Sequence, residues 1–193
     1  MSYARFMRAN PAYKKITAEE FLNIDFGTDR RFELEDGVIV MMTGGNGRHA
    51  WVQGNIFHAL RGMLKGSRCR PYGPDMGVWV GGNDLRYPDV SIYCGDKSVE
   101  DLAEERALHD PTVVIEVLSP STATLDQGTK LEQYSALPSI QEIVFVDPVN
   151  ELVRIRRRQG PESWHDTFWA QPHDMTLRSV GVTVPHADIF SRT

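Results

Sequence analysis

The segment Thr112-Val113-Val114-Ile115-Glu116-Val117-Leu118 is the strongest strand signal in the chain, and it decides the fold class. It is apolar almost throughout, as expected for a strand that is covered on both faces. A helix is expected within residues 122–137, and the run from Glu142 to Val146 predicts a second buried strand. Because strands alternate with a crossover helix, the sequence predicts an α/β fold with a mixed sheet.

Further helices and strands are predicted on either side of this unit. Thr17 and Glu20 fit a capping box that starts a short helix, and Asp36-Gly37 between two strand-like runs predicts a hairpin over residues 31–42. Apolar residues at helical spacing predict a longer helix over residues 49–65, with Gly66 at its C-terminal cap. The remaining predictions are a polar helix near residues 99–107, a last turn at 186–190, and strands near residues 68–72, 76–80, 89–93, 152–158, 166–170 and 180–184.

The bulk composition is typical of a single domain, with 193 residues of which 41% are hydrophobic. We expect this domain to span residues 16–193, after a loose N-terminal arm over residues 1–15. The formal net charge is −5. An acidic chain can bind nucleic acid only through a local basic patch, so such a patch is required for any function of that kind.

The cysteines and the hydropathy pattern bear on the compartment. The chain has two cysteines, Cys69 and Cys94, and its sequence contains no CxxC pair. Neither a disulfide framework nor a cysteine-based zinc site is therefore expected, which suits a reducing cytoplasm. The N-terminus has no apolar signal core, and no apolar run approaches the ~18 residues that span a bilayer. We expect a soluble cytoplasmic protein without a membrane partner.

Glu116 does not fit a purely structural interpretation of its strand. By the period-2 geometry of a strand, it shares a face with Val114 and Leu118. An ionised carboxylate on such a face costs several kcal/mol unless a partner compensates for it. A metal ion, a lysine or arginine, or a position at the solvent-exposed rim could each meet that need.

Asp89 is the second carboxylate of interest, and it follows Pro88 at the start of an apolar strand. Alone, Pro-Asp is a common turn signal. Two carboxylates on neighbouring strands can converge on one ion, however, and oxygen ligands of this kind suit Mg²⁺ or Mn²⁺. Asp89 and Glu116 are therefore candidate metal ligands.

One series of motifs runs through roughly residues 16–190. It consists of Phe32-Glu33-Leu34-Glu35-Asp36-Gly37-Val38-Ile39, the helix starting at His49, Pro88-Asp89, Glu116-Val117-Leu118-Ser119-Pro120-Ser121-Thr122, Lys130 with Tyr134, and Val146-Asp147-Pro148. Together these motifs resemble a large bacterial family of restriction-endonuclease-like proteins abundant in cyanobacteria, which looks like a branch of the PD-(D/E)XK nuclease superfamily. The resemblance implies a restriction-endonuclease-like core, in which a central mixed sheet is flanked by helices.

The same resemblance implies the activity and the roles of several residues. It implies a metal-dependent endonuclease that hydrolyses phosphodiester bonds, with DNA as the expected substrate and Mg²⁺ or Mn²⁺ as the cofactor. Asp89 and Glu116 would match the acidic metal ligands, and the backbone carbonyl of Val117 would be a further ligand. Glu33 could match an acidic residue that some members add near the start of the fold.

The sequence departs from the parent superfamily motif at one position. The parent motif places a lysine two residues after the acid, where this chain has Leu118. By the resemblance, the lysine has moved to the following helix, which points to Lys130. A long ammonium side chain can reach the same point from another backbone position. Lys130 lies four residues before Tyr134, so the two share a helix face. The alternative is a solvated helix lysine.

His49 is a weaker candidate for the site. It follows Arg48 and a glycine-rich loop at the start of a predicted helix. The N-terminus of a helix favours anions, so His49 could contact a phosphate or adjust the outer shell of the metal. The alternative is a helix-terminal histidine that faces solvent.

The best basic cluster covers residues 154–158 and lies within the strand predicted over residues 152–158. As a strand, it places Arg154, Arg156 and Arg158 on one face. That face could track the phosphates of DNA, with Arg48 and Tyr134 as further contacts. Alternatively, it could protect a sheet edge against aggregation.

Three functions remain open at this point. The first is a nuclease that binds Mg²⁺ or Mn²⁺ and cuts DNA, for which a homodimer would suit the cutting of two strands. The second is a nuclease-fold protein that binds nucleic acid or a protein partner without catalysis, motivated by Leu118 and by the acidic net charge. The third is a structural dimer in which Glu116 pairs with an arginine.

Overall fold

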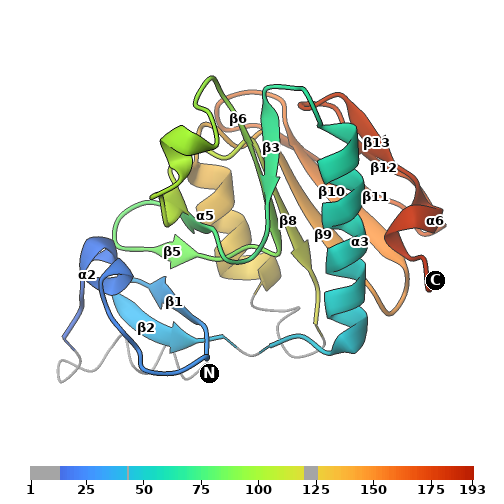
Figure 1. Ribbon diagram of the computed structural model, residues 1–193. Helices are drawn as coiled ribbons and strands as arrows, with labels where there is room; N and C mark the ends of the chain where they lie inside the picture. The colour runs from blue at the N-terminus through green and yellow to red at the C-terminus, as the bar shows by residue number, and fades with distance from the viewer. Residues whose placement is uncertain (1–13, 43, 120–125) are drawn as a thin grey trace.

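The computed structural model describes residues 14–42, 44–119 and 126–193. Most of the predicted N-terminal arm and the start of the helix predicted within 122–137 therefore lie outside the described residues. The described part contains three sheets, and the largest carries the predicted strand–helix–strand unit (Figure 1). Within the described ranges, no helix is long and apolar enough to cross a membrane.

The largest sheet has six strands in the order β11-β10-β9-β8-β6-β3. These strands are β3 (Cys69–Tyr72), β6 (Val90–Cys94), β8 (Val113–Val117), β9 (Glu142–Asp147), β10 (Leu152–Arg158) and β11 (Trp164–Phe168). β8 and β9 run parallel, whereas every other neighbouring pair in this sheet is antiparallel. The predicted mixed α/β fold is therefore confirmed, and β8, which decides it, is buried at every residue.

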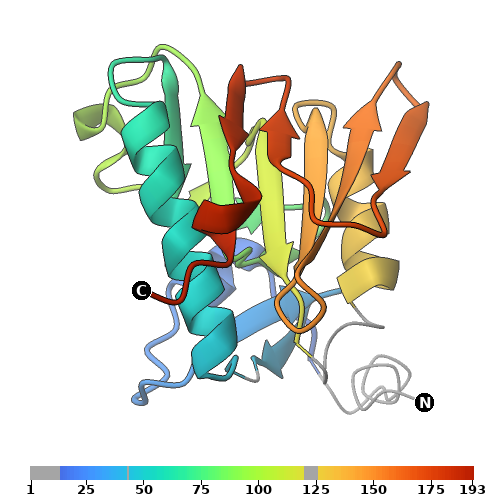
Figure 2. The same cartoon turned by 90° about the vertical axis from the view of Figure 1, so that its right-hand side faces the viewer.

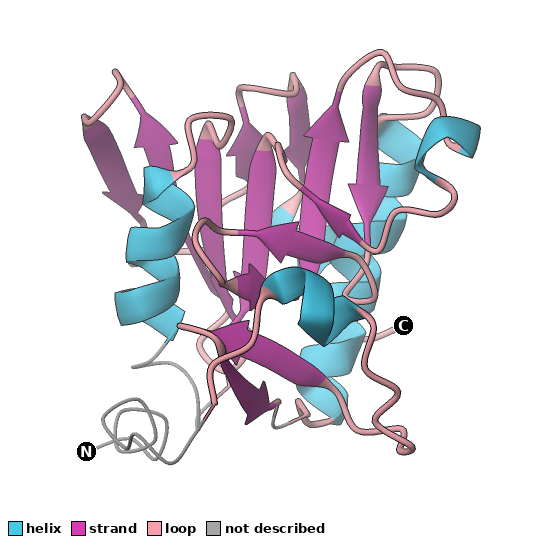
Figure 3. Cartoon of the chain, turned by 90° about the vertical axis from the view of Figure 1, so that its left-hand side faces the viewer, coloured by secondary structure: helices cyan, strands magenta, loops and turns pink. Residues whose placement is uncertain are grey.

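Helices cover both faces of this sheet, as Figures 2 and 3 show from opposite sides. The helices are α2 (Ala18–Leu22), α3 (Gly47–Met63), α5 (Leu131–Ala136) and α6 (His186–Ile189), and a π-helical turn, η2 (Asp126–Lys130), directly precedes α5. On one face, Ile56 of α3 packs in the same apolar cluster as Ile115. On the other face, Tyr134 of α5 packs with Val114. Because side chains alternate along a strand, Glu116 shares the α5 face with Val114.

The ends of the predicted elements shift by about two residues, within the usual uncertainty for element boundaries. α3 starts at Gly47 rather than at residue 49, because the Asn46 side chain caps it and accepts a hydrogen bond from the His49 N–H at 3.0 Å. β11 likewise starts earlier than predicted. The strand predicted near residues 180–184 is β13 (Val182–Val184), and its antiparallel partner β12 (Met175–Leu177) was not predicted. This hairpin and α6 join the core on the α3 side of the large sheet.

A smaller, five-stranded sheet lies beside the large one, with the order β2-β1-β5-β4-β7. Its strands are β1 (Phe32–Glu35), β2 (Val38–Met41), β4 (Gly77–Trp79), β5 (Leu85–Arg86) and β7 (Ala107–Leu108). β1 and β2 form the predicted hairpin, and its turn residues Asp36 and Gly37 both have positive φ, at 50° and 73°. Such angles are those of the two-residue turn that matches strand twist. The predicted capping box of Thr17 and Glu20 is also confirmed, at the start of α2.

The helix predicted near residues 99–107 is wrong. The structure has only a 3₁₀ turn, η1 (Glu100–Leu102), and residues 107–108 form β7, which pairs parallel with β4. Val99 rather than Ser98 is the N-cap of this turn, although the Ser98 hydroxyl accepts a hydrogen bond from the Asp101 N–H at 3.1 Å. A local polar turn therefore produced a helix-like signal. The short strand β7 depends on a tertiary partner that the local sequence does not reveal.

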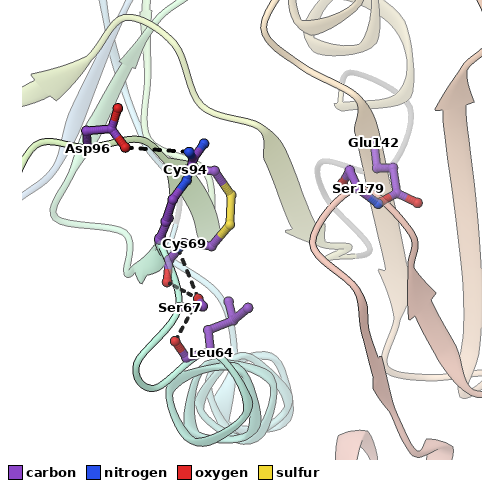
Figure 4. The surroundings of a disulfide bond; sticks show 8 residues. Leu64, Ser67, Cys69, Cys94, Asp96, Glu142 and Ser179 are labelled. Atoms are coloured by element: carbon purple, nitrogen blue, oxygen red, sulfur yellow. Dashed lines mark hydrogen bonds and ion pairs between the residues drawn. A yellow bond between two sulfur atoms is a disulfide. The ribbon is translucent and has the colours of Figure 1, made fainter.

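The cysteine prediction is also wrong, because Cys69 and Cys94 form a disulfide (Figure 4). The two residues are directly opposite each other in the antiparallel pair of β3 and β6, with their Cα atoms 4.0 Å apart. Their spacing of 25 residues carries no sequence motif, so the pairing follows from strand register alone. The argument for a reducing compartment that rested on these cysteines therefore does not hold.

We expect reduction of this disulfide to lower the free energy of unfolding by roughly 3 kcal/mol, because the bond closes a loop of 25 residues in the unfolded chain. Urea unfolding with and without a reductant would measure the difference. The Cys69→Ala/Cys94→Ala variant serves as the control, and its unfolding midpoint should not respond to the reductant. Equal midpoints for the oxidised and reduced wild-type protein would contradict the prediction.

Candidate active site

Asp89 lies where the chain passes from the small sheet to the large one. β5 ends at Arg86, β6 begins at Val90, and Pro88 between them is buried. The strand register pairs Val90 with Ile115, so the next position of the ladder sets Asp89 opposite Glu116. Directly opposite residues of an antiparallel pair have Cβ atoms about 5 Å apart. The two predicted metal ligands therefore lie on neighbouring strands at the same end of the sheet.

The Asp89 carboxylate faces the backbone of Val117 and the ring of His49. Asp89 Oδ2 accepts a hydrogen bond from the Val117 N–H at 2.7 Å, and it lies 3.2 Å from His49 Nε2. The N–H and C=O of a strand residue point to the same side, so the Val117 carbonyl faces this point as well. Among the described residues, both polar contacts of this carboxylate use Oδ2.

His49 belongs to this cluster rather than to the solvent. Its side chain is only 15% exposed, in the first turns of α3. The hydrogen bond to Asp89 raises the pKa of His49, and this effect, together with the Asp89 charge and the Val117 backbone, outweighs the opposing effect of burial. In Figure 1 the start of α3 and the end of β8 lie together at the lower edge of the large sheet. The alternative of a solvent-facing histidine is therefore wrong.

Glu116 is buried, with 4% of its surface exposed. Its Oε1 accepts a hydrogen bond from the Tyr134 hydroxyl at 2.7 Å and lies 3.3 Å from Lys130 Nζ. Burial raises the pKa of Tyr134 well above its ordinary value, with the Glu116 charge as a further cause, so the phenol stays protonated and donates. The rim position considered for Glu116 is thus excluded, and a lysine is among its partners.

Lys130 is the last residue of η2, directly before α5, and its side chain is 13% exposed. Its ammonium lies between two carboxylates, 3.3 Å from Glu116 Oε1 and 3.4 Å from Glu33 Oε1. Lys130 is therefore not a solvated helix lysine. It joins Glu33 of the small sheet to Glu116 of the large sheet.

Glu33 is buried on β1 and has both carboxylate oxygens engaged. Oε1 accepts a hydrogen bond from the Tyr87 N–H at 3.1 Å and faces Lys130, whereas Oε2 lies 3.1 Å from Arg86 NH1. Burial alone would raise the pKa of Glu33, but the charges of Lys130 and Arg86 and the Tyr87 hydrogen bond outweigh it and lower the pKa. Glu33 is therefore a charged carboxylate held close to Lys130.

Two residues of this cluster, Arg86 and Glu35, were not predicted from the sequence. Arg86 is 3% exposed and also lies 3.6 Å from Glu35 Oε2. A signal was available, because Glu33 and Glu35 alternate on one strand face and two buried acids require a nearby cation. The identity of that cation depends on the pairing of β1 with the two-residue strand β5, which local sequence does not indicate.

The oxygen donors near Asp89 and Glu116 fit a hard divalent cation. Among the described residues there is no group of three His, Cys, Asp or Glu side chains that could hold a metal. A site here would use two carboxylates and the Val117 carbonyl, with water in the remaining positions. Mg²⁺ commonly binds through one or two carboxylates and keeps several waters, and Mn²⁺ accepts the same oxygen donors. The chemistry therefore suits Mg²⁺ or Mn²⁺ and does not suit structural zinc.

The predicted basic stripe has the expected geometry but different surroundings. Arg154, Arg156 and Arg158 alternate with buried residues on β10, which is an interior strand of the sheet, so they do not protect an edge. Arg154 and Arg156 both contact Asp166 at 3.0 Å. Arg158 donates to four backbone carbonyls and stacks 4.2 Å from the Trp164 ring centroid. Arg48 is exposed at the start of α3.

Known proteins share this fold and sequence. A family model, Uma2, described as "Putative restriction endonuclease", matches residues 18–183. Two Synechocystis sp. relatives are each 25% identical: uncharacterized protein slr1290 over 172 residues, covering 89% of each chain, and uncharacterized protein sll1609 over 152 residues, covering 78% of this chain and 85% of the relative. A crystal structure from Anabaena variabilis, described as a putative nuclease belonging to DUF820, has a TM-score of 0.71 at 21% identity and covers 91% of this chain and 98% of that chain. The predicted resemblance is confirmed, and the chain belongs to the Uma2 family.

Proposed function

We propose that the protein is a metal-dependent endonuclease that hydrolyses the phosphodiester bonds of DNA. The observation that carries this proposal is the position of Lys130, which is nearly buried between Glu33 and Glu116. A lysine next to a pair of acidic metal ligands can counter the charge that develops on a phosphate during hydrolysis, while the metal activates the water. The Uma2 family match and the nuclease-like fold support the same function.

The metal would be held by Asp89, Glu116 and the Val117 carbonyl. When bound, a divalent cation lowers the pKa of its water and neutralises the non-bridging phosphate oxygens. The protein supplies the rest of the arrangement. Tyr134 fixes the orientation of Glu116 by its 2.7 Å hydrogen bond, and the Val117 N–H fixes Asp89 at 2.7 Å. These fixed donors orient both carboxylates before any substrate arrives.

Lys130 would act on the substrate rather than on the protein alone. Its ammonium can orient the attacking water and counter the negative charge that grows on the phosphate. Glu33 holds this ammonium from the opposite side and is charged at neutral pH. His49, on the Asp89 side, would contribute a ring N–H donor to the outer shell of the metal or to a phosphate.

Contacts to the phosphate backbone would come from arginines outside this cluster. Arg48 is exposed and adjoins His49 in the sequence. Arg154 and Arg156 both contact Asp166, so one carboxylate faces two guanidinium charges. We assign these residues to DNA binding, with Arg158 and Tyr134 acting through the structure that they support. Two copies of the chain would place two sites on the two strands of a duplex, which is why we propose a homodimer.

The proposal predicts that Mn²⁺ or Mg²⁺ stabilises the protein. At a metal concentration about 100 times Kd, binding contributes about 2.7 kcal/mol, which corresponds to a rise in Tm of roughly 5 to 10 °C. The Asp89→Asn variant should lose this rise, whereas Asp96→Asn, at an exposed carboxylate near the disulfide, should keep it. Thermal unfolding with and without the metal measures both. A wild-type Tm that does not respond to either ion would refute the metal site.

A further inference from the structure

Arg86 connects the small sheet to helix α5 next to Lys130. It belongs to β5 of the small sheet, yet its Nε donates to Gln133 Oε1 of α5 at 2.8 Å. Gln133 in turn donates to Asp84 Oδ2 at 2.5 Å. Gln133 lies three residues after Lys130, on the same helical segment. The buried Arg86 guanidinium therefore links β5 to α5, the helix that directly follows Lys130.

The carboxylates of β1 are paired with two cationic side chains, Arg86 and Lys130. Arg86 NH1 faces Glu33 Oε2 at 3.1 Å and Glu35 Oε2 at 3.6 Å, whereas Lys130 faces the other oxygen of Glu33. If Arg86 were neutral, the acidic pair on β1 would attract the Lys130 ammonium more strongly. The flexible ammonium would then move toward β1 and away from Glu116.

We infer that Arg86, held by Gln133, is a positioning residue that keeps the Lys130 ammonium against Glu116. It contacts Glu33 and Glu35 and acts through these two carboxylates. The planar guanidinium suits this role, because its donors reach three acceptors in fixed directions, which an ammonium does not reproduce. This inference rests on the proposed function for its effect on cleavage, but the geometry that it asserts does not depend on cleavage.

The test compares Arg86→Met with Arg157→Met. Arg157 is a matched control, because it is 7% exposed and pairs with the buried Glu142 at 2.9 Å, on the opposite face of the large sheet from Lys130. Both variants should lower Tm, since each leaves buried carboxylates without an arginine. Only Arg86→Met should lower kcat for DNA cleavage, on the order of 10- to 100-fold, as expected when a reacting group is displaced by about 1 Å. Its KM and its Mn²⁺ affinity should change by less than about threefold, because the metal ligands stay in place.

A conservative pair of variants covers the case in which the methionine variants do not fold. Arg86→Lys keeps the positive charge but cannot serve Glu33, Glu35 and Gln133 together, so its kcat should lie between those of the wild type and Arg86→Met. Arg157→Lys should keep the wild-type kcat. An equal loss of kcat in the Arg86 and Arg157 variants, or no loss in either, would overturn the positioning role.

A crystal structure of the Arg86 variant separates this inference from the nuclease proposal. The distance from Lys130 Nζ to Glu116 Oε1, 3.3 Å in the wild type, should increase beyond hydrogen-bonding range. If that contact is unchanged in Arg86→Met or Arg86→Lys, the positioning role is wrong, whatever the activity. If the wild-type protein does not cut DNA but the contact is lost in the variant, the nuclease proposal fails and the positioning role stands.

Discussion

Replacing Glu116 with glutamine is expected to lower the rate of DNA cleavage by about 10³-fold, which corresponds to ~4 kcal/mol of transition-state stabilisation. Glutamine keeps the shape of the side chain and can still accept the hydrogen bond from Tyr134. It loses the negative charge that a divalent cation requires. Asp89→Asn should have an effect of the same order, because the amide can still accept from the Val117 N–H but lacks the negative charge.

Glu142→Gln is the matched control for this prediction. Glu142 is as buried as Glu116 and lies on the neighbouring parallel strand, but it contacts Arg157 and Ser179 instead of the candidate site. The control should lose stability and keep the cleavage rate of the folded protein. A plasmid-nicking time course with Mn²⁺ measures both variants, and circular dichroism confirms their folding. A Glu116→Gln variant that retains a tenth or more of the wild-type cleavage rate would rule out Glu116 as a metal ligand in the reaction.

Replacing Lys130 with methionine is expected to lower cleavage by about 10²- to 10³-fold, as expected when a charge that stabilises the transition state is removed. Restoring a lysine at the parent motif position tests the relocation directly. Leu118 lies two residues after Glu116 and packs only partly buried at the edge of the α5-side core. Leu118→Lys/Lys130→Met should therefore recover a measurable part of the lost rate. Recovery no better than Lys130→Met alone would argue against a catalytic lysine that moved from strand to helix.

The loss of stability caused by Lys130→Met should also depend on pH. The pKa of Glu33 lies below its ordinary value of 4.5 in the folded protein, with Lys130 as the largest favourable cause. A lowered carboxyl pKa stabilises the folded state above the unfolded pKa, and this stabilisation is lost as the pH falls through the folded pKa. The variant should thus be destabilised most at neutral pH, by about 3 kcal/mol. The difference from the wild type should shrink below pH 4.5, and urea unfolding at several pH values measures it.

The central strands were predictable because their signal is local. The apolar run at β8 and the strand at β9 each fill both sides of a buried layer, so composition alone indicates them. β5 and β7 have only two residues each and exist because other strands pair with them. The disulfide was not predictable for the same reason, since only the register of β3 with β6 brings Cys69 and Cys94 together.

The candidate site divides in the same way. Asp89 and Glu116 stand out because a charged residue in or beside an apolar strand is costly without a partner. Lys130 required the family resemblance, because a lysine on a polar helical segment has no local feature that distinguishes it. Arg86 depends on the pairing of β5 with β1 and on the contact with α5, so no periodicity of the sequence points to it.

The parallel pairing of β8 with β9 has a consequence for how such sites change during evolution. A parallel pair obliges the chain to leave β8 at the end that carries Glu116 and to return along the face that α5 covers. Any long cationic side chain in the first turns of that return therefore starts within reach of the acid. Under the proposed assignment, Leu118 stands at the strand position of the lysine and Lys130 supplies the charge from downstream on the same crossover. Searches that require acid and lysine at a fixed spacing would pass over such members, whereas the pair of acids and the crossover that follows them would still identify the site.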